Sequence, residues 1–181
     1  MAYVDHFRLA LHDLLLYSPD RQTLAQRALG WAQRLAGGDG AFVIDSDRTI
    51  LASQGIDPAE ASRIAARKDF LSAPGRKHEP WRRDHMLIVP LDLHSGPGAI
   101  VLISGQRTPI FGDDELSHLA EYAMSITAGL DRVTLTSRVQ ALEKAKSDFL
   151  NIASHELRGP MTIIRGYLTM LEAGSLGEVC L

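Results

Sequence analysis

Hydrophobic positions recur at helical spacing in two segments near the start of the chain. From residue 4 to residue 15, apolar side chains return every three or four positions, which predicts a helix with one buried stripe. Ser18 can supply an N-cap oxygen and Pro19 suits a first helical turn, so a second helix is predicted from there to Leu35. The predicted inner face of this second helix consists of Leu24, Ala28, Trp31, Ala32 and Leu35.

Four short apolar runs predict two β-hairpins. The first pairs residues 41–44 with 49–53, and the second pairs residues 86–91 with 99–103 across a turn at 94–98. The second pair is almost wholly apolar, as in central strands that are covered on both faces. Pro90 cannot donate to a ladder and predicts either a bulge or a free edge.

Between the hairpins the pattern predicts a short helix and a loop. Asp57 and Glu60 have the spacing of a capping box, with Ile56 placed to staple the entry of a helix that runs to about Leu71. Residues 73–85 carry two prolines and a glycine without apolar periodicity, which predicts a surface loop. The fold class is therefore α+β, with an antiparallel sheet flanked by helices.

A long helix is predicted from residue 113 onward. No proline or glycine pair interrupts the chain before Gly159-Pro160, which indicates about 45 helical residues. We expect the first part to pack on the sheet through Leu116, Leu119, Ala123, Ile126 and Leu130.

The middle of this helix has a seven-residue apolar repeat. Leu135, Val139, Leu142 and Phe149 keep the repeat, whereas Leu130 and Val133 are out of step with it, as at a stutter in a coiled coil. The favoured interpretation is a paired helix that follows a globular domain. A single solvated helix that lies along its own domain is the alternative.

Composition narrows the class of protein. The chain has 181 residues, 45% of them hydrophobic, and a net charge of -3, which argues against nucleic-acid binding. Cys180 is the single cysteine, so no internal disulfide is possible and covalent chromophore attachment within residues 1–179 is not expected. We find no signal peptide and no apolar run of about 20 residues, and we therefore expect a cytoplasmic protein without a membrane span.

The strongest candidate for chemistry is His155, followed directly by Glu156. On a helical projection His155 lies about 160° from Leu157, so its imidazole is predicted to face solvent. A neutral imidazole is a good nucleophile near pH 7, and a nearby carboxylate can orient it. Pro160 is predicted to kink or loosen the next turn. Six apolar residues fall within about 40° of Leu157 and form the predicted partner-facing stripe: Leu150, Ala153, Met161, Ile164, Leu168 and Leu171.

The string Phe-Leu-Asn-Ile-Ala-Ser-His-Glu-Leu-Arg-Gly-Pro-Met, which begins at Phe149, resembles the phosphoacceptor box of two-component sensor histidine kinases. The resemblance spans residues 146–172. Upstream, residues 20–130 resemble a GAF-type sensor domain by the order of their elements, with a PAS-type domain as the alternative.

The resemblance implies specific roles. His155 would accept the γ-phosphoryl group of ATP and pass it to an aspartate of a response regulator, and Glu156 would activate the imidazole. The family pairs as a homodimer and binds ATP and Mg²⁺ in a separate domain. That domain is not in this sequence, so the chain is interpreted as a fragment that is inactive alone. Gly159 departs from the family, which usually has threonine or asparagine there to position a water for dephosphorylation of the regulator.

Four segments are predicted: an N-terminal helix (1–17), a GAF-like sensor (18–130), a coiled-coil signalling helix (131–147) and a truncated phosphoacceptor helix (148–181). The sensor ligand and its binding residues are not indicated by the sequence. The other histidines lack metal-ligand spacing, so no metal is expected. The basic cluster of Arg76, Lys77, Arg82 and Arg83 either binds an anion or is simply solvated. The competing functional class is a non-enzymatic dimeric ligand-binding regulator that transmits a signal through its helix.

Overall fold

The computed structural model describes residues 2–16, 18–67, 79–105 and 112–173. It divides into two compact units, Met1–Thr136 (the N-terminal unit) and Ser137–Leu181 (the C-terminal unit). Within the described residues, five strands form one antiparallel sheet in the order β2-β1-β5-β4-β3. The elements are α1 (Ala2–Leu15), α2 (Arg21–Ala36), β1 (Gly40–Ile44), β2 (Ile50–Gln54), α3 (Pro58–Ala65), β3 (Trp81–Arg83), β4 (Met86–Leu93), β5 (Gly96–Ile103) and α4 (Asp113–Glu172).

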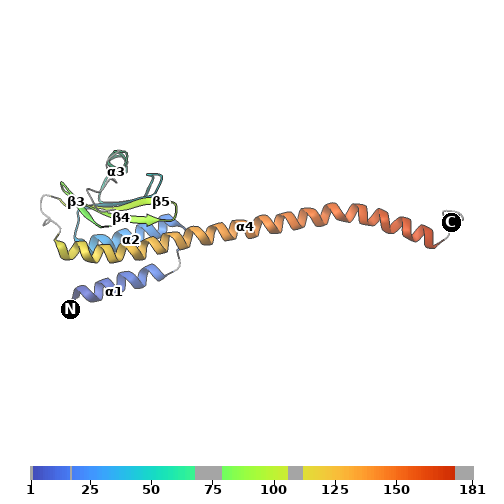
Figure 1. The fold of residues 1–181 in the computed structure, drawn as a ribbon, viewed down its shortest axis with the longest axis horizontal. Coiled ribbons are helices and arrows are strands. Elements are labelled where there is room, and N and C mark those ends of the chain that lie inside the picture. Colours follow the sequence, from blue (N-terminus) through green and yellow to red (C-terminus); the bar gives the residue numbers. More distant parts are fainter. Residues whose placement is uncertain (1, 17, 68–78, 106–111, 174–181) are drawn as a thin grey trace. The chain divides into compact units, whose positions relative to one another are not determined.

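In the N-terminal unit the sheet lies between helices on its two faces (Figure 1). Helix α2 and the first part of α4 cover one face, α1 packs on the outer side of these helices, and α3 covers the other face. Side chains on β1 alternate between the two faces, since Val43 belongs to the core under the three helices and Phe42 to the core under α3. The prediction of an α+β fold whose central strands are covered on both sides is confirmed.

The first turn of α2 corrects the predicted cap. Asp20, not Ser18, is the N-cap residue, and its carboxylate accepts the backbone N–H of Thr23 at 2.8 Å. The Thr23 hydroxyl also donates to this carboxylate, at 2.9 Å. The hydrogen bonds from the backbone N–H and the hydroxyl of Thr23 lower the pKa of the Asp20 carboxyl. Ser18 is buried instead, where its hydroxyl accepts a hydrogen bond from the Arg27 guanidinium at 2.8 Å. The helix therefore begins two residues after Pro19.

The α3 helix is shorter than predicted. Asp57 caps it as expected, accepting the backbone N–H of Ala59 at 3.3 Å, but the helix ends at Ala65 and not near Leu71. Arg48 from the turn after β1 donates to the carbonyl oxygens of Ala66 and Arg67, at 3.4 and 3.2 Å. These bonds satisfy carbonyl groups at the end of the helix and provide a reason for it to stop there.

The loop predicted at residues 73–85 contains a strand. Trp81–Arg83 forms β3 and pairs with Met86–Ile88 across a tight turn in which Asp84 has φ 54°. The sequence pattern does not indicate this strand, because the strand has only three residues and is flanked by turn residues at both ends. Residues 73–78 of the predicted loop lie outside the described residues.

Pro90 lies at an edge of the sheet that β3 leaves uncovered. The β4–β5 register runs from Met86 to Leu93 without a shift, and β3 reaches only Ile88. The free-edge interpretation of Pro90 therefore holds, and the bulge is excluded. The turn of this hairpin is also tighter than predicted, because β4 ends at Leu93 and β5 begins at Gly96.

The long helix α4 does not end at Gly159-Pro160 but continues through the proline to Glu172, within the predicted phosphoacceptor helix. Beyond the proline, Thr162 donates its hydroxyl to the carbonyl oxygen of Arg158 at 2.7 Å. In its first part Leu119, Ala123, Ile126 and Leu130 are buried and Leu116 is half-buried, which confirms the predicted inner face. Gly129 allows close packing there, because a Cβ at this position would lie 3.1 Å from Cδ2 of Leu24.

Candidate functional site

His155 lies on α4 within the C-terminal unit, where its side chain is exposed, as are its neighbours in the sequence on every side of the helix. Glu156 is also exposed. Consecutive residues on a helix point about 100° apart, so the two side chains leave the backbone in different directions. The arrangement leaves the imidazole open to a large reaction partner.

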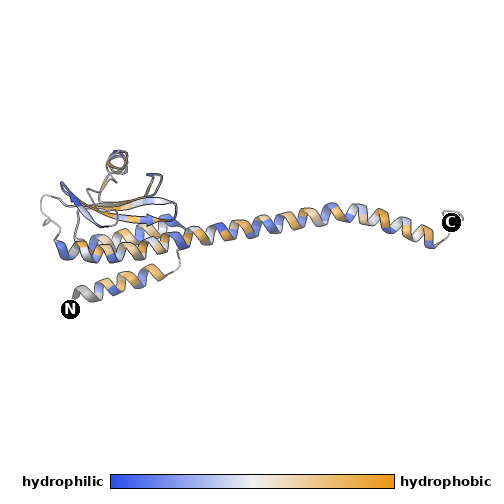
Figure 2. Ribbon diagram, viewed as in Figure 1, coloured by the Kyte–Doolittle hydropathy of each residue, from blue (hydrophilic) through white to orange (hydrophobic). Residues whose placement is uncertain are grey.

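Every large apolar residue of the predicted partner-facing stripe is exposed in the single chain. Leu157 is 62% exposed and Met161 is 61% exposed. Figure 2 shows hydrophobic residues recurring in orange along the length of α4. Contiguous apolar surface of this kind marks an interaction site. The remaining large members are exposed to a similar degree: Leu150, Ile164, Leu168 and Leu171.

Gly159 lies one helical turn beyond His155 in open surroundings. A Cβ built at this position would meet no atom within 4 Å, and the same holds at Gly166. A larger side chain at either glycine would therefore fit on the single helix without a clash.

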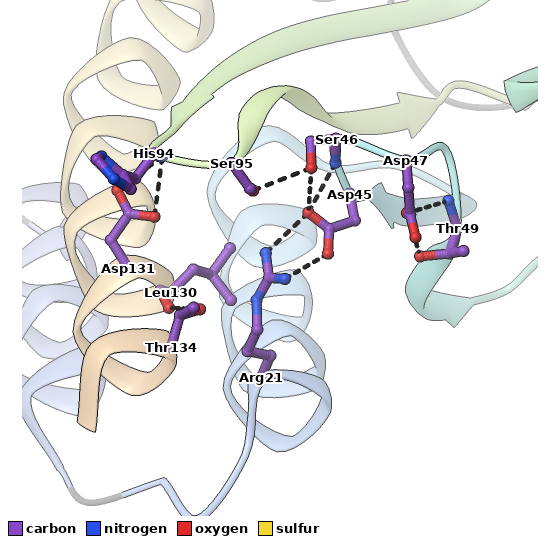
Figure 3. Close-up of polar contacts among 10 residues, drawn as sticks. All are labelled: Arg21, Asp45, Ser46, Asp47, Thr49, His94, Ser95, Leu130, Asp131 and Thr134. Atoms are coloured by element: carbon purple, nitrogen blue, oxygen red, sulfur yellow. Dashed lines mark hydrogen bonds and ion pairs between the residues drawn. The ribbon is translucent and has the colours of Figure 1, made fainter. Parts of the chain in front are cut away.

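A polar network lies at one end of the N-terminal unit (Figure 3). The Arg21 guanidinium forms a two-pronged ion pair with the buried Asp45 carboxylate, with one N···O distance of 2.8 Å. Ser46, beside Asp45, donates its hydroxyl to the Ser95 hydroxyl at 2.9 Å. The network therefore joins the start of α2 to the turns of both hairpins. Sequence reasoning missed it because its members are far apart in the chain.

The basic cluster is only partly described. Arg82 forms an ion pair with Asp113 at 2.6 Å, while Arg76 and Lys77 lie outside the described residues. Trp31 is half-buried against the core, and the Arg34 guanidinium lies 4.9 Å from the centre of its ring. Trp31 thus has the packing role that its helical position predicts.

Two apolar cavities open on the helical side of the N-terminal unit, and no sequence pattern indicates either of them. One, of about 370 Å³, is bounded by Val89 and Pro90 of β4 and by Met124 of α4. The other, of about 350 Å³, lies between Leu11 and Leu15 of α1 and Ala128 of α4. Both are lined mainly by apolar side chains.

The described residues contain neither a cluster of metal-ligating side chains nor a helix suited to span a membrane. No group of three or more histidine, cysteine, aspartate or glutamate side chains is placed to hold a metal ion. In the same part of the chain, no helix combines the length and apolar character needed to cross a membrane.

Comparisons with known proteins support both resemblances found in the sequence, the phosphoacceptor box and the GAF-type domain. Residues 145–179 match the His Kinase A (phospho-acceptor) domain family. A comparison with curated proteins finds no match. Two solved GAF domains resemble the chain in fold. The GAF domain of a candidate sensor histidine kinase from Pseudomonas syringae pv. tomato has a TM-score of 0.59 at 17% identity, covering 77% of this chain and 92% of its own. The GAF domain of an Acinetobacter phosphoenolpyruvate-protein phosphotransferase has a TM-score of 0.56 at 12% identity. This match covers 73% of the present chain and 94% of the Acinetobacter domain.

The chain therefore combines a GAF-type fold with a segment, residues 145–179, that matches the His Kinase A (phospho-acceptor) domain family. This confirms the resemblance to GAF-containing sensor histidine kinases that the sequence indicates, and it decides the fold in favour of GAF.

Proposed function

We propose that this chain is the sensor and phosphoacceptor portion of a cytoplasmic two-component histidine kinase, with His155 as the phosphorylated residue. The observation that carries the proposal is the exposed imidazole of His155 within the segment that matches the phosphoacceptor family. In this proposal residues 18–130 sense a signal, residues 131–147 form a coiled coil that transmits it, and residues 148–181 belong to the phosphoacceptor domain.

The proposed reaction has two transfers. A ring nitrogen of His155 attacks the γ-phosphorus of ATP, the bond to the bridging oxygen breaks, and ADP leaves with that electron pair. The imidazole keeps the phosphoryl group as a phosphoramidate and loses its N–H proton. An aspartate carboxylate of a response regulator then attacks the phosphorus, the P–N bond breaks, and the imidazole takes up a proton again.

The contribution of this chain is position and access. Phosphoryl transfer depends mainly on placing donor and acceptor in line, and a solvent-facing nucleophile can be approached by two different partners in turn. Glu156 is proposed to orient the imidazole or accept its proton when the reacting partners are in place. ATP and Mg²⁺ would be brought by an ATP-binding domain of the histidine kinase type.

Homodimerisation is the second part of the proposal. The exposed apolar stripe around Leu157 and the seven-residue repeat of Leu135, Leu142 and Phe149 both need a covering surface. A second copy of the same helix provides one of matching pattern.

The test is phosphorylation in trans. The chain is mixed with the isolated ATP-binding domain of a related histidine kinase and with ATP labelled on its γ-phosphate. We expect label that is stable in alkali and labile in acid, as for a phosphoramidate, and expect it to be lost in His155→Gln. The matched control is His94→Gln, which removes another exposed histidine and should leave labelling unchanged. Label that persists in His155→Gln would contradict the assignment.

A further inference from the structure

Asn151 lies one helical turn before His155, on the same side of α4. Residues four apart on a helix differ in direction by only about 40°, and their Cβ atoms are about 5 to 6 Å apart. Asn151 also lies about 120° from Leu157 on the helical projection, so it does not belong to the apolar stripe. Asn151 and His155 therefore share a polar side of the C-terminal unit, and both are exposed there.

The direction of helical side chains brings the imidazole toward Asn151. Side chains on a helix lean toward its N-terminus, so the ring of His155 lies over the preceding turn, which carries Asn151 and Ile152. The side chain of Ile152 has no polar atom. On the following turn Gly159 has no side chain, and a Cβ built there would meet no atom within 4 Å. Of the two positions four residues from His155, only position 151 therefore provides a polar group.

Asparagine is not a residue that the helix itself favours at position 151. In a helix interior asparagine is less stable than alanine, because its amide competes with the backbone for hydrogen bonds. Asn151 is the only asparagine among the 181 residues of the chain. Within the described part of the chain, its side chain makes no hydrogen bond that would stabilise the helix. A residue that opposes local preference without a compensating contact is a candidate for a functional role.

The chemistry of the amide suits a phosphoryl group on the neighbouring ring. The Asn151 side chain carries two N–H donors and no charge. A phosphoryl group presents negatively charged oxygens, and hydrogen bonds to charged acceptors are stronger than those between neutral groups. The short side chain reaches only about one helical turn, which is the separation between Asn151 and His155.

We propose that the side-chain amide of Asn151 donates a hydrogen bond to the phosphoryl group while that group is transferred to His155 and held there. This inference rests on the proposed function and adds a residue that contacts the reacting group. The amide gives up no proton, so the bonds made and broken are those of the transfer already described. Its role is to stabilise negative charge on the phosphoryl oxygens, while Glu156 acts on the imidazole.

The test compares rates of labelling of His155 by γ-labelled ATP and an ATP-binding domain of the histidine kinase type. Asn151→Ala removes the amide and should slow labelling about fivefold at saturating ATP-binding domain, as expected for one lost hydrogen bond. Weakening of the helix does not explain such a loss, because alanine is the better helix former. Gln140→Ala is the matched control, since it removes another exposed amide of α4 and should leave the rate unchanged.

Asn151→Asp separates a donor from an acceptor. Aspartate has the same shape, but its carboxylate has no N–H donor and repels the phosphoryl oxygens, so labelling should be slower than in Asn151→Ala. If residue 151 instead accepted a hydrogen bond from the imidazole, Asn151→Asp would label at the native rate or faster, and the proposed donor role would be overturned. The concentration of ATP-binding domain that gives half the maximal rate should stay unchanged in both variants. A rise in that concentration with an unchanged maximal rate would assign Asn151 to docking, contrary to the proposal.

The outcomes for Asn151 and His155 are distinguishable. Labelling of His155 at the native rate in Asn151→Ala overturns the role of Asn151 and leaves the proposed function intact. Label that persists in His155→Gln, or a chain that is never labelled, overturns both.

Discussion

The carboxylate of Asp131 on α4 accepts the backbone N–H of His94, with both oxygens 3.1 Å from the nitrogen (Figure 3). His94 begins the two-residue turn between β4 and β5, so this contact joins the turn to α4. Val133, two residues further along α4, is still buried in the core of the N-terminal unit. The first part of α4 is therefore anchored to the N-terminal unit at least as far as Val133.

Asp131→Ala should lower the free energy of unfolding of the N-terminal unit by about 1 kcal/mol, because it leaves the N–H of His94 without its charged acceptor. Asp131→Asn keeps an acceptor oxygen and should lose less. Chemical denaturation measures both, with Glu121→Ala as the control at an exposed acidic position of α4. Equal losses in Asp131→Ala and Glu121→Ala would show that the contact contributes nothing.

The ion pair of Arg21 and Asp45 should contribute more to the free energy of unfolding than the contact between Asp131 and His94 does. The side chains are 24% and 9% exposed, so Asp45→Ala strands a half-buried guanidinium and should cost about 2 kcal/mol of unfolding free energy. The double variant Arg21→Met, Asp45→Ala should lose less than the sum of the two single changes, since it leaves no unpaired charge. Strict additivity in urea denaturation would argue against coupling.

Acid should destabilise the N-terminal unit partly through Asp20. Hydrogen bonds from Thr23 lower the pKa of this carboxyl from its model-peptide value of 3.8, so the folded state binds its proton less readily than the unfolded state does. The resulting stabilisation is complete above pH 3.8 and is lost as the pH falls through the lower folded value. Asp47 is shifted in the same direction by Thr49.

Asp20→Asn isolates this effect, because asparagine caps a helix as well as aspartate does but does not titrate. Unfolding free energies between pH 2 and pH 6 should show a shallower acid decline for Asp20→Asn than for the native chain. Parallel curves for the two proteins would be inconsistent with a lowered pKa at Asp20.

In the proposed kinase, Gly159 should make dephosphorylation of the response regulator slow, because glycine offers no group to position a water at the regulator aspartyl phosphate. We predict faster loss of phosphate from the regulator with Gly159→Thr. Gly166→Thr is the matched control, since it makes the same change at another unobstructed position of α4. Rapid dephosphorylation that does not depend on residue 159 would refute this prediction.

Local patterns in the sequence predicted most of the fold. Helical periodicity placed the inner faces of α2 and α4, and turn residues placed both hairpins, because each of these signals lies within about ten neighbouring residues. Strand β3 was missed because three residues between turns carry too short a pattern. The cap of α2 was misplaced because Ser18 has an alternative partner, Arg27, which only the folded chain brings near.

The candidate sites also divide into features set by local sequence spacing and features set by tertiary packing. The candidate site around His155 is read from helical spacing and a local motif alone, because both signals lie within a short stretch of sequence. The contact of Asp131 with His94 and the cavity beside Ala128 depend on tertiary packing, which brings together residues from distant parts of the chain. Helical periodicity does not contain that information.

The most direct test of the central proposal is the identity of the phosphorylated residue. After incubation with an ATP-binding domain in trans and γ-labelled ATP, mass spectrometry of the chain, carried out under conditions that preserve phosphoramidates, should place the phosphoryl group on His155. Label on any other residue, or an unlabelled chain under conditions in which a known phosphoacceptor domain is labelled, would contradict the proposal.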